Sequence, residues 1–528
     1  MWNRKYLLPE TCLRSVHEYQ WLRTSGCLPS SAAKDVVQSL DAFARRMKIT
    51  ARLAVHRLCV NTVCWSEDGR RILSGSDDRM LAVTDPFCGP NERDVKFRSH
   101  HEGIIFCARF LPKTNSTQAI SCGANGLVIL HDLNYLEMPV NVYQLCEPSC
   151  AVKRVAVFQD NPSTFLACCH DRVIRLMDIR LKLANSDKVG EVLMHGFEFA
   201  HTLDVSAKRP YLLAVGALGP MVSLVDLRKV SGNANAKDAV CSIMGYNPKS
   251  ERTVGQVTCV QFAPFGDELL ASFSSGKLYL LDSIRFSGES GYCLPTEGSQ
   301  ATRVHLRMAG DWSDTGPTSR PSIYSHAVNV NDQAIQINYL NGVLNRLLRD
   351  TSPRMIPRLL EQLRLTFATH RSSNDASAAV SASRQAQIDN SEEMDFSSMY
   401  NASQNLPQPL VVNAFAGHRN CRTRCKEANF WGRRYVISGS DCGRIFIWDK
   451  STGSIVAVHE GDQHVVNCVQ PHPYMPILAT SGIDHNVKIW APVGKDIPLE
   501  DMNIEDIVSN NATMTSLAEL TLSFPTSL

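Results

Sequence analysis

Short apolar runs that end in a turn recur along the whole chain. Within each run, hydrophobic and small residues occupy five or six positions and are bounded by Gly, Ser or Asp, a pattern typical of β-strands. Successive runs end 42 to 56 residues apart, except for one gap of 167 residues. This spacing predicts seven repeats, whose runs are LAVTD ending at Asp85, VILHD at Asp132, IRLMD at Asp178, VSLVD at Asp226, LYLLD at Asp282, IFIWD at Asp449 and VKIWA at Ala491.

The repeat period predicts the fold class. Each unit carries further strand candidates before its aligned run, such as RRILSGSDD in the first and YVISGSDCG in the sixth. Repeats of about 40–45 residues with four short strands are typical of WD-repeat propellers. We therefore expect an all-β, seven-bladed β-propeller with blades one to five in residues 49–283 and blades six and seven in residues 411–492. Residues 49–55 (ITARLAV) alternate like a strand and are expected to close the ring as the outer strand of blade seven.

Three segments lie outside the predicted ring. Residues 1–48 form a helix–loop–helix, in which Ser30/Ser31 cap a helix that runs to about Lys48 with Val36, Leu40, Phe43, Ala44 and Met47 on one apolar face. This helix either packs on the propeller or enters a partner's groove. Residues 284–410, between blades five and six, form an insertion with helices near 340–349 and 357–365 and a disordered stretch over 371–408. Residues 493–528 form a tail with a short helix and disorder.

WD blades are braced by a His, a Ser or Thr, an Asp and a Trp, and the chain keeps parts of this set. At the Asp position, blades two, four and five carry Asn125, Gly219 and Ser275 instead. These three blades are therefore expected to depend more on apolar packing than on buried hydrogen bonds. The residues predicted to form the network are His56, Ser74 and Asp78 in blade one, Asp171 in the blade-three turn, His418, Ser438 and Trp448 in blade six, and Thr480, Asp484 and Trp490 in blade seven.

Composition and motifs exclude several classes of function. A net charge of +2 gives no general argument for a nucleic-acid or anionic-membrane partner, and no signal peptide is recognisable. Eighteen Cys are scattered through the chain and are expected to be reduced. Cys421 and Cys425 lack a second pair of ligands for zinc, and no catalytic motif is found. The sequence predicts neither an enzyme nor a metal or cofactor site.

Two neighbouring repeats end in the same triplet. Asp178-Ile179-Arg180 closes repeat three and Asp226-Leu227-Arg228 closes repeat four. The Asp is common at this position, whereas an Arg two residues later is not needed for folding. Its recurrence in adjacent blades indicates a docking surface. Asn134 and Ser451 occupy the corresponding positions of repeats two and six.

The chain resembles WD-repeat substrate receptors of cullin-4 RING ubiquitin ligases, and specifically the nuclear receptor interaction protein branch of the cullin-4-associated factors. GDWSDTGP is notable because it lies outside the repeats, where propeller constraints do not explain it. The matching stretches are residues 43–65, 72–87, 103–112, 310–317 (GDWSDTGP), 426–449 and 465–492.

The resemblance implies a non-catalytic subunit that recruits protein targets for ubiquitination. Arg180 and Arg228 would bind the ligase adaptor, the large subunit of the damage-specific DNA-binding protein, and through it cullin-4. Asp178 and Asp226 would brace the local turns, and the preceding helices, with Phe43 and Met47, would enter the adaptor's groove. The substrate is not identifiable, and residence in the nucleus, the cytoplasm or both is expected.

One alternative is a ligase-independent scaffold or a transcriptional coregulator of nuclear receptors that uses the insertion helices. Relatives bind nuclear receptors and calmodulin through an acidic region that is much reduced here. Ile335-Gln336 leads into an imperfect calmodulin motif, for which a plain amphipathic helix is the simpler interpretation.

Overall fold

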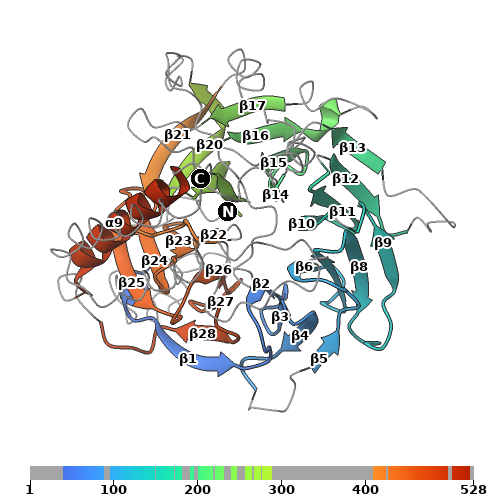
Figure 1. Cartoon of the computed structure of the whole chain (residues 1–528), viewed down its shortest axis with the longest axis horizontal. Coiled ribbons are helices and arrows are strands. Elements are labelled where there is room, and N and C mark those ends of the chain that lie inside the picture. Colours follow the sequence, from blue (N-terminus) through green and yellow to red (C-terminus); the bar gives the residue numbers. More distant parts are fainter. Residues whose placement is uncertain are drawn as a thin grey trace, which may run out of the picture. The chain divides into compact units, whose positions relative to one another are not determined.

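The predicted repeats fold as seven antiparallel sheets of four strands each, arranged around a central axis (Figure 1). They belong to the unit formed by Met1–Met308 and Leu406–Leu528, whereas Ala309–Asn405 form a second unit. The computed structural model describes residues 40–88, 95–148, 150–171, 173–180, 191–195, 200–217, 221–230, 240–245, 256–264, 267–274, 276–287, 408–423, 426–496 and 502–523. The first predicted helix, the start of the second, and the insertion helices lie outside these residues.

Each of blades one to four is a consecutive run of four strands. Blade one contains β2 (Val60–Trp65), β3 (Ile72–Ser76), β4 (Met80–Thr84) and β5 (Val95–Arg98). Blade two contains β6 (Ile105–Phe110), β7 (Gln118–Gly123), β8 (Leu127–Asp132) and β9 (Asn141–Gln144). Blade three contains β10 (Val152–Phe158), β11 (Asn161–Cys169), β12 (Val173–Asp178) and β13 (Glu191–His195). Blade four contains β14 (Thr202–Val205), β15 (Leu212–Gly216), β16 (Met221–Asp226) and β17 (Val240–Gly245), with the short 3₁₀ helix η1 (Leu227–Lys229) after β16.

The last three blades include segments that are distant in sequence. Blade five contains β18 (Val257–Phe262), β19 (Glu268–Phe273), β20 (Lys277–Ser287) and β21 (Gln408–Phe415). Blade six contains β22 (Ala428–Trp431), β23 (Tyr435–Gly439), β24 (Arg444–Asp449) and β25 (Ile455–Glu460). Blade seven contains β26 (Val466–Pro471), β27 (Leu478–Gly482), β28 (Val487–Ala491) and β1 (Lys48–Leu53). The predicted seven-bladed propeller is confirmed.

The insertion interrupts blade five and does not follow it. β21 pairs with β20, so the outer strand of blade five comes after the long excursion of the chain. The boundary predicted at residues 410/411 falls inside β21 and is corrected accordingly. The repeat spacing marks the end of the third strand of each blade. In blade five the insertion follows that third strand, so the spacing gave no sign of a fourth strand beyond it.

The ring closes through the predicted terminal strand. β1 pairs antiparallel with β28, with Ile49 opposite Trp490 and Lys48 opposite Ala491. Helix α3 (Asp41–Arg45) ends just before β1, so the prediction of a helix that runs to Lys48 is wrong at its C-terminal end. The closing strand recruits the residues from Lys48 onward, and β-branched Ile49 and Thr50 favour a strand.

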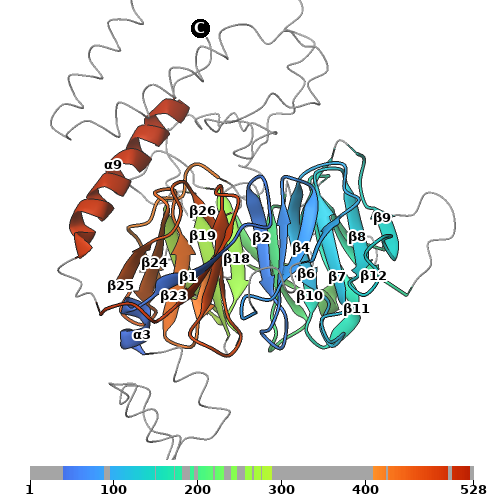
Figure 2. The ribbon, with the colours of Figure 1, turned by 90° about the horizontal axis from the view of Figure 1, so that it is seen from below.

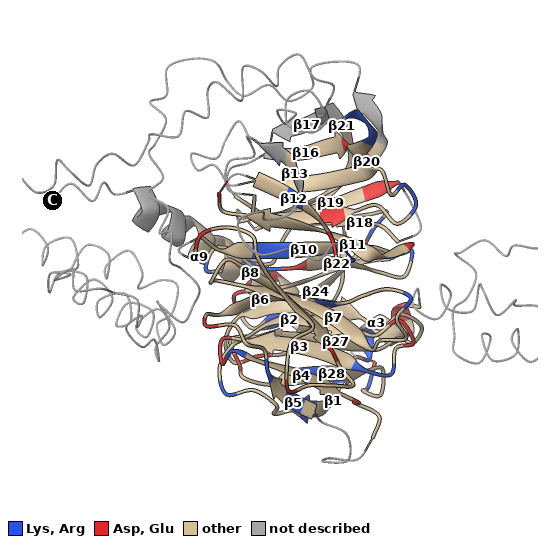
Figure 3. Ribbon diagram, turned by 90° about the vertical axis from the view of Figure 1, so that its right-hand side faces the viewer, with Lys and Arg blue, Asp and Glu red and all other residues tan. Residues whose placement is uncertain are grey.

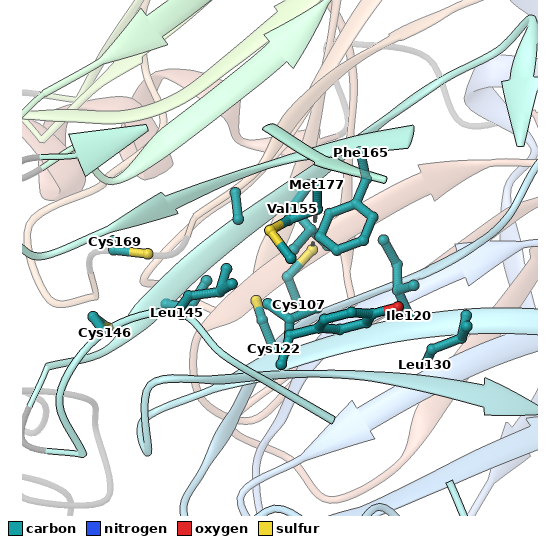
Figure 4. Close-up of a cluster of buried hydrophobic side chains, with 14 of the residues drawn as sticks. Cys107, Ile120, Cys122, Leu130, Leu145, Cys146, Val155, Phe165, Cys169 and Met177 are labelled. Carbon is teal, nitrogen blue, oxygen red and sulfur yellow. Dashed lines mark hydrogen bonds between the residues drawn. The ribbon is translucent and has the colours of Figure 1, made fainter. Parts of the chain in front are cut away.

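Cys residues act as small apolar side chains in the core. Between blades two and three, Cys107, Cys122 and Cys169 are buried among Val155, Phe165 and other aliphatic residues (Figure 4). Burial raises the pKa of the Cys168 thiol, so this group stays neutral and packs as a hydrophobe. Cys107, Cys122, Cys168 and Cys169 form no disulfide.

A buried carboxylate links opposite sides of the ring. Glu427, just before β22, lies 3.3 Å from Arg109 of blade two and contacts Arg154 of blade three. Its other oxygen accepts hydrogen bonds from Cys468 Sγ and Gln470 Nε2 of blade seven, both at 2.7 Å. Burial alone would raise the pKa of Glu427, but Arg154 and Arg109 lower it to about 2. This axial ion-pair cluster ties four blades together.

The predicted blade networks form in blades one and seven. In blade one, His56 Nε2 lies 2.8 Å from Ser74 Oγ and His56 Nδ1 lies 3.2 Å from Asp78 Oδ1. In blade seven, Trp490 Nε1 donates to Thr480 Oγ1 at 2.9 Å. Asp484 Oδ1 lies 3.2 Å from Nδ1 of His464, a residue that the sequence analysis had not assigned.

Blade two keeps a buried hydrogen-bond network, contrary to the prediction that it depends more on apolar packing than on such bonds. His101 lies 3.0 Å from Asn125 Oδ1 and 2.9 Å from Ser121 Oγ, and His131 lies 2.8 Å from the same Ser121 oxygen. The Asn amide oxygen is an acceptor like a carboxylate oxygen, which explains why the substitution is tolerated. Gly219 and Ser275, which carried the same prediction for blades four and five, lie outside the described residues.

Blade six departs from the predicted network. Neither ring nitrogen of His418 has a hydrogen-bond partner among the described residues, and burial lowers the pKa of His418 to about 3. Ser438 Oγ instead donates to the Glu427 carbonyl at 3.2 Å, and Trp448 Nε1 donates to the Ala416 carbonyl at 2.9 Å. The His418 ring packs edge-on against the Trp448 ring at 5.4 Å, but the predicted hydrogen bonds among His418, Ser438 and Trp448 do not form, because Cys442 replaces the Asp that would orient the imidazole.

Two further segments complete the described structure. Asp171 of blade three accepts from the Val173 amide at 3.1 Å and pairs with Arg175 at 2.6 Å, so it braces its own turn. The tail forms helix α9 (Ile504–Ser523), which is longer than the predicted short helix. Ile504 and Ile507 of α9 pack against the core shared by blades five and six. Within the described residues, no helix is long and apolar enough to cross a membrane.

We expect Glu427→Gln to destabilise the ring. At pH 7 the change would leave Arg109 and Arg154 buried without their counter-charge, lowering the free energy of unfolding by about 3 kcal/mol or more. Because the folded-state pKa of about 2 is below the ordinary value of 4.5, the stabilisation is present above about pH 4.5 and is lost as the pH falls toward 2.

Urea unfolding of both proteins as a function of pH measures this effect. Glu460→Gln is the matched control, since Glu460 is exposed and forms a surface ion pair with Arg444. An unchanged unfolding midpoint for Glu427→Gln at neutral pH would contradict the structural role of the axial ion-pair cluster.

Candidate docking face

The two Asp-x-Arg triplets lie on the same face of the ring. In each antiparallel blade the third strand runs in the direction of the first, so the first-to-second and third-to-fourth loops emerge on one face. We call this the docking face. Asp178 ends β12 and Asp226 ends β16, both third strands of adjacent blades. Arg180 and Arg228 therefore follow the third strands of neighbouring blades.

The Asp of each triplet shapes a tight turn. Asp178 Oδ1 accepts the amide of Arg180 at 2.9 Å, and Asp226 Oδ1 accepts the amide of Arg228 at 3.0 Å. The same Asp-to-(i+2) bond occurs in three other blades, where the second residue is Phe87, Asn134 or Ser451. The predicted bracing role of Asp178 and Asp226 fits this geometry, since the bond forms whatever side chain follows.

The Asp also aims the Arg side chain. Arg180 Nε donates to Asp178 Oδ1 at 2.9 Å and its Nη2 donates to Oδ2 at 2.5 Å. Arg228 bonds Asp226 in the same way, at 3.0 and 2.7 Å. The hydrogen bonds from Arg180 and Arg228 lower the pKa of Asp178 and of Asp226, so both carboxylates stay charged. In each triplet, the Nε and Nη2 groups of the guanidinium therefore bind the Asp carboxylate.

Both Arg side chains remain open to solvent. The Arg180 side chain is 70% exposed and that of Arg228 is 64% exposed. The Arg228 guanidinium stacks over the Tyr211 ring at 3.7 Å, a contact that the sequence pattern did not indicate. With two of its five N–H groups engaged by the Asp, each guanidinium has donors left for a partner. Pre-orientation by the Asp reduces the entropy lost when that partner binds.

Two lysines on this face pair with carboxylates of a neighbouring blade. Lys208 of blade four lies 2.6 Å from Asp267 of blade five, and Lys450 of blade six lies 2.7 Å from Glu268 of blade five. These pairs hold adjacent blades together. Arg180 and Arg228 differ from these lysines because each pairs with the Asp of its own turn.

Helix α3 lies on the same face at blade six. Asp41 contacts Arg434 at 3.1 Å, in the loop before β23, and Tyr435, the first residue of β23. His459 lies 2.7 Å from the Ala44 carbonyl. Acidic and basic residues gather around α3 (Figure 3). The side view shows α3 and α9 at opposite faces of the ring (Figure 2). The N-terminal segment is thereby anchored on the docking face.

The two residues of this segment that are predicted to bind the adaptor, Phe43 and Met47, differ in exposure to solvent. Met47 is 5% exposed and packs with Ala44, Trp431 and Trp490 in the core of blades six and seven. Its side chain is committed to the propeller, so its assignment as an adaptor contact is corrected. Phe43 is half-buried and retains an accessible edge. The interpretation that the helix packs on the propeller is the one that fits α3.

The described residues contain no group of three or more His, Cys, Asp or Glu side chains placed to hold a metal ion. Burial raises the pKa of Cys421 to about 12, which keeps this thiol neutral. Its sequence neighbour Cys425 lies outside the described residues.

Comparison with known proteins finds WD-repeat similarity in two segments of the chain and over most of its length in several relatives. The family described as "WD domain, G-beta repeat" matches residues 47–85 and 453–491, which lie at the two ends of the ring. The human protein "DDB1- and CUL4-associated factor 6" is 22% identical over 92% of both chains. The mouse protein "WD and tetratricopeptide repeats protein 1" is 26% identical over 88% of both, and the Arabidopsis "Protein ALTERED SEED GERMINATION 2" is 23% identical over 90% of both. These matches confirm the resemblance to a WD-repeat, cullin-4-associated factor.

We expect the Asp and Arg residues of the triplets to differ in their effect on folding. Asp226→Ala removes the acceptor for the Arg228 amide and should lower the free energy of unfolding by about 1 kcal/mol. Arg180→Ala with Arg228→Ala should leave the melting temperature unchanged, because both side chains are exposed. Thermal unfolding of the variants measures the difference. A marked loss of stability in the double Arg variant would mean that these side chains serve the fold.

Proposed function

We propose that the chain is the substrate-recognition subunit of a cullin-4 RING ubiquitin ligase, docked on the ligase adaptor through Arg180 and Arg228. The observation that carries the proposal is the pair of exposed, Asp-oriented guanidinium groups at equivalent positions of adjacent blades. The name of the human relative supports the choice of partner, since it describes that protein as associated with DDB1 and CUL4. The subunit itself would be non-catalytic.

Arg suits this docking role for a geometric reason. Its planar fork bonds carboxylate or carbonyl groups with defined directions, and the Asp of each turn fixes the fork before the partner arrives. Two such forks on neighbouring blades define an orientation as well as a position. Phe43, on the anchored helix α3 of the same face, is a further candidate contact.

The function that follows is one of proximity. A target protein bound elsewhere on the receptor is brought near a charged ubiquitin-conjugating enzyme on the same complex, which raises its effective concentration. Because α3 anchors the N-terminal segment on the docking face, the opposite face, where α9 packs, is left for other partners.

The test is direct binding of the purified full chain to the purified adaptor, for example by biolayer interferometry. Arg180→Ala with Arg228→Ala should weaken binding by about a hundredfold, as expected for the loss of two oriented Arg anchors. Arg180→Lys with Arg228→Lys should also bind weakly, since an ammonium lacks the fork.

Arg57→Ala serves as the control, because Arg57 is an exposed arginine in the loop before β2, on the opposite face. Adaptor binding that survives in the double Ala variant would contradict the docking assignment. In that case a ligase-independent scaffold would be the better account of the chain.

A further inference from the structure

The exposed apolar side chains of the propeller are unevenly distributed. Among the described residues, six of the twelve large hydrophobic side chains exposed to solvent lie in docking-face loops, and one, Leu58, lies in a loop of the opposite face. The others lie on or beside outer strands of blades. Exposed apolar residues that gather at one place mark an interaction surface, and the six lie on three different blades. The six are Phe87, Tyr135, Met138, Tyr474, Met475 and Val493.

Blade two carries the two most exposed members of this set. Tyr135 is 76% exposed and Met138 is 73% exposed, in the loop that joins β8 to β9. This loop follows Asp132, the counterpart of Asp178 in the next blade. Tyr and Met side chains are therefore presented beside Arg180, on the same face. Tyr, Met and Arg are the residue types enriched in the buried centres of protein interfaces.

The loop backbone is fixed while these side chains point away from the core. The Leu133 amide donates to the Thr117 carbonyl at 2.7 Å, and the Val140 amide donates to the Leu130 carbonyl at 2.8 Å. Leu133 and Leu136 pack against the core of blades one and two. The loop is thus anchored at Leu133, Leu136 and Val140, while Tyr135 and Met138 between these anchors are exposed.

We propose that Tyr135 and Met138 form the apolar part of the docking surface, extending it from Arg228 and Arg180 onto blade two. This inference rests on the function proposed above and names the adaptor as the occupant. The adaptor would present an apolar pocket to Tyr135 and Met138 next to carboxylate or carbonyl groups for the two arginines. The turn geometry supports this continuity, because Asp132, Asp178 and Asp226 hold their loops with the same bond.

The chemistry of the two parts is complementary. The arginines fix direction, and much of the affinity lost on their removal comes from partner oxygens left without a hydrogen bond. Burial of a Tyr ring and a Met side chain removes apolar surface from water, which is the usual source of affinity. An apolar contact beside oriented charges also excludes water from them and strengthens their hydrogen bonds.

The experiment measures adaptor binding by the full chain carrying Tyr135→Ala with Met138→Ala. We expect affinity to fall by at least about tenfold with an unchanged melting temperature. Two control variants are matched. Tyr474→Ala with Met475→Ala removes the same side-chain types from blade seven on the same face, and Leu58→Ala removes an exposed apolar side chain from the opposite face. Both controls should bind like the wild type.

The outcomes separate this inference from the proposed function. Adaptor binding that is lost in the double Arg variant but unchanged in the Tyr135/Met138 variant overturns the extension to blade two alone. Equal losses in the blade-two and blade-seven variants would indicate a general effect of apolar surface and would also overturn it. Loss of self-association with intact adaptor binding would assign the patch to a second copy of the chain. If the wild type does not bind the adaptor, both proposals fail.

Discussion

The pairing of β1 with β28 is the constraint on which the rest of the structure depends. Blade seven takes three strands from the C-terminal part of the ring and its fourth from residues that precede blade one. Without β1, Trp490 and its bond to Thr480 would lie beside an open sheet edge, and the ring would have two free ends. Closure also decides where α3 lies, because the helix ends three residues before β1 and packs on blades six and seven. The axial contacts of Glu427 then require blades two, three, six and seven to face each other, which only a closed ring provides.

In the turn after the third strand, one residue serves the fold and another is available for binding. In five blades an Asp at the end of the third strand accepts the amide two residues later, so the loop shape does not depend on the side chain at that second position. The second position is therefore free to carry Phe87, Asn134, Arg180, Arg228 or Ser451. In blades three and four the same Asp also holds the guanidinium. A residue required for folding thus orients a side chain that folding does not require.

The spacing of the repeats predicted most of the fold. It did not predict which side chains form hydrogen bonds, because those partners are brought together only in the folded structure. The seven repeats, the closing strand and the two Arg positions follow from spacing, because a strand end recurs at fixed intervals. The hydrogen-bond networks within the blades do not follow from this spacing. Asn125 replaces the usual Asp of blade two, yet it still bonds His101. His418 of blade six makes no ring hydrogen bond within the described residues, because Cys442 stands where an Asp would orient it.

At the N-terminal helix, the apolar periodicity predicted a buried face but not the surface that covers it. The apolar face that includes Ala44 and Met47 predicted a surface that something must cover, but the pattern does not say what covers it. The structure places both side chains in the core of blades six and seven, so the propeller itself is the partner. The Tyr211 ring under Arg228 lies in another loop, 17 residues earlier in the chain, and no local pattern connects the two.

The two faces of the ring differ in a way that bears on how the chain would assemble. In its described loops, the docking face holds six large exposed apolar side chains and two arginines oriented by their own turns, while Lys208 and Lys450 pair with a neighbouring blade. The opposite face has α9 packed on blades five and six and a single exposed large hydrophobic side chain, Leu58, in its described loops. Exposed apolar area that is held in place by an ordered backbone persists at a free-energy cost in the isolated chain, and burial against a partner removes that cost. Affinity for a permanent partner should therefore reside on the docking face, while the opposite face suits weaker, exchangeable contacts of the kind a recruited substrate makes.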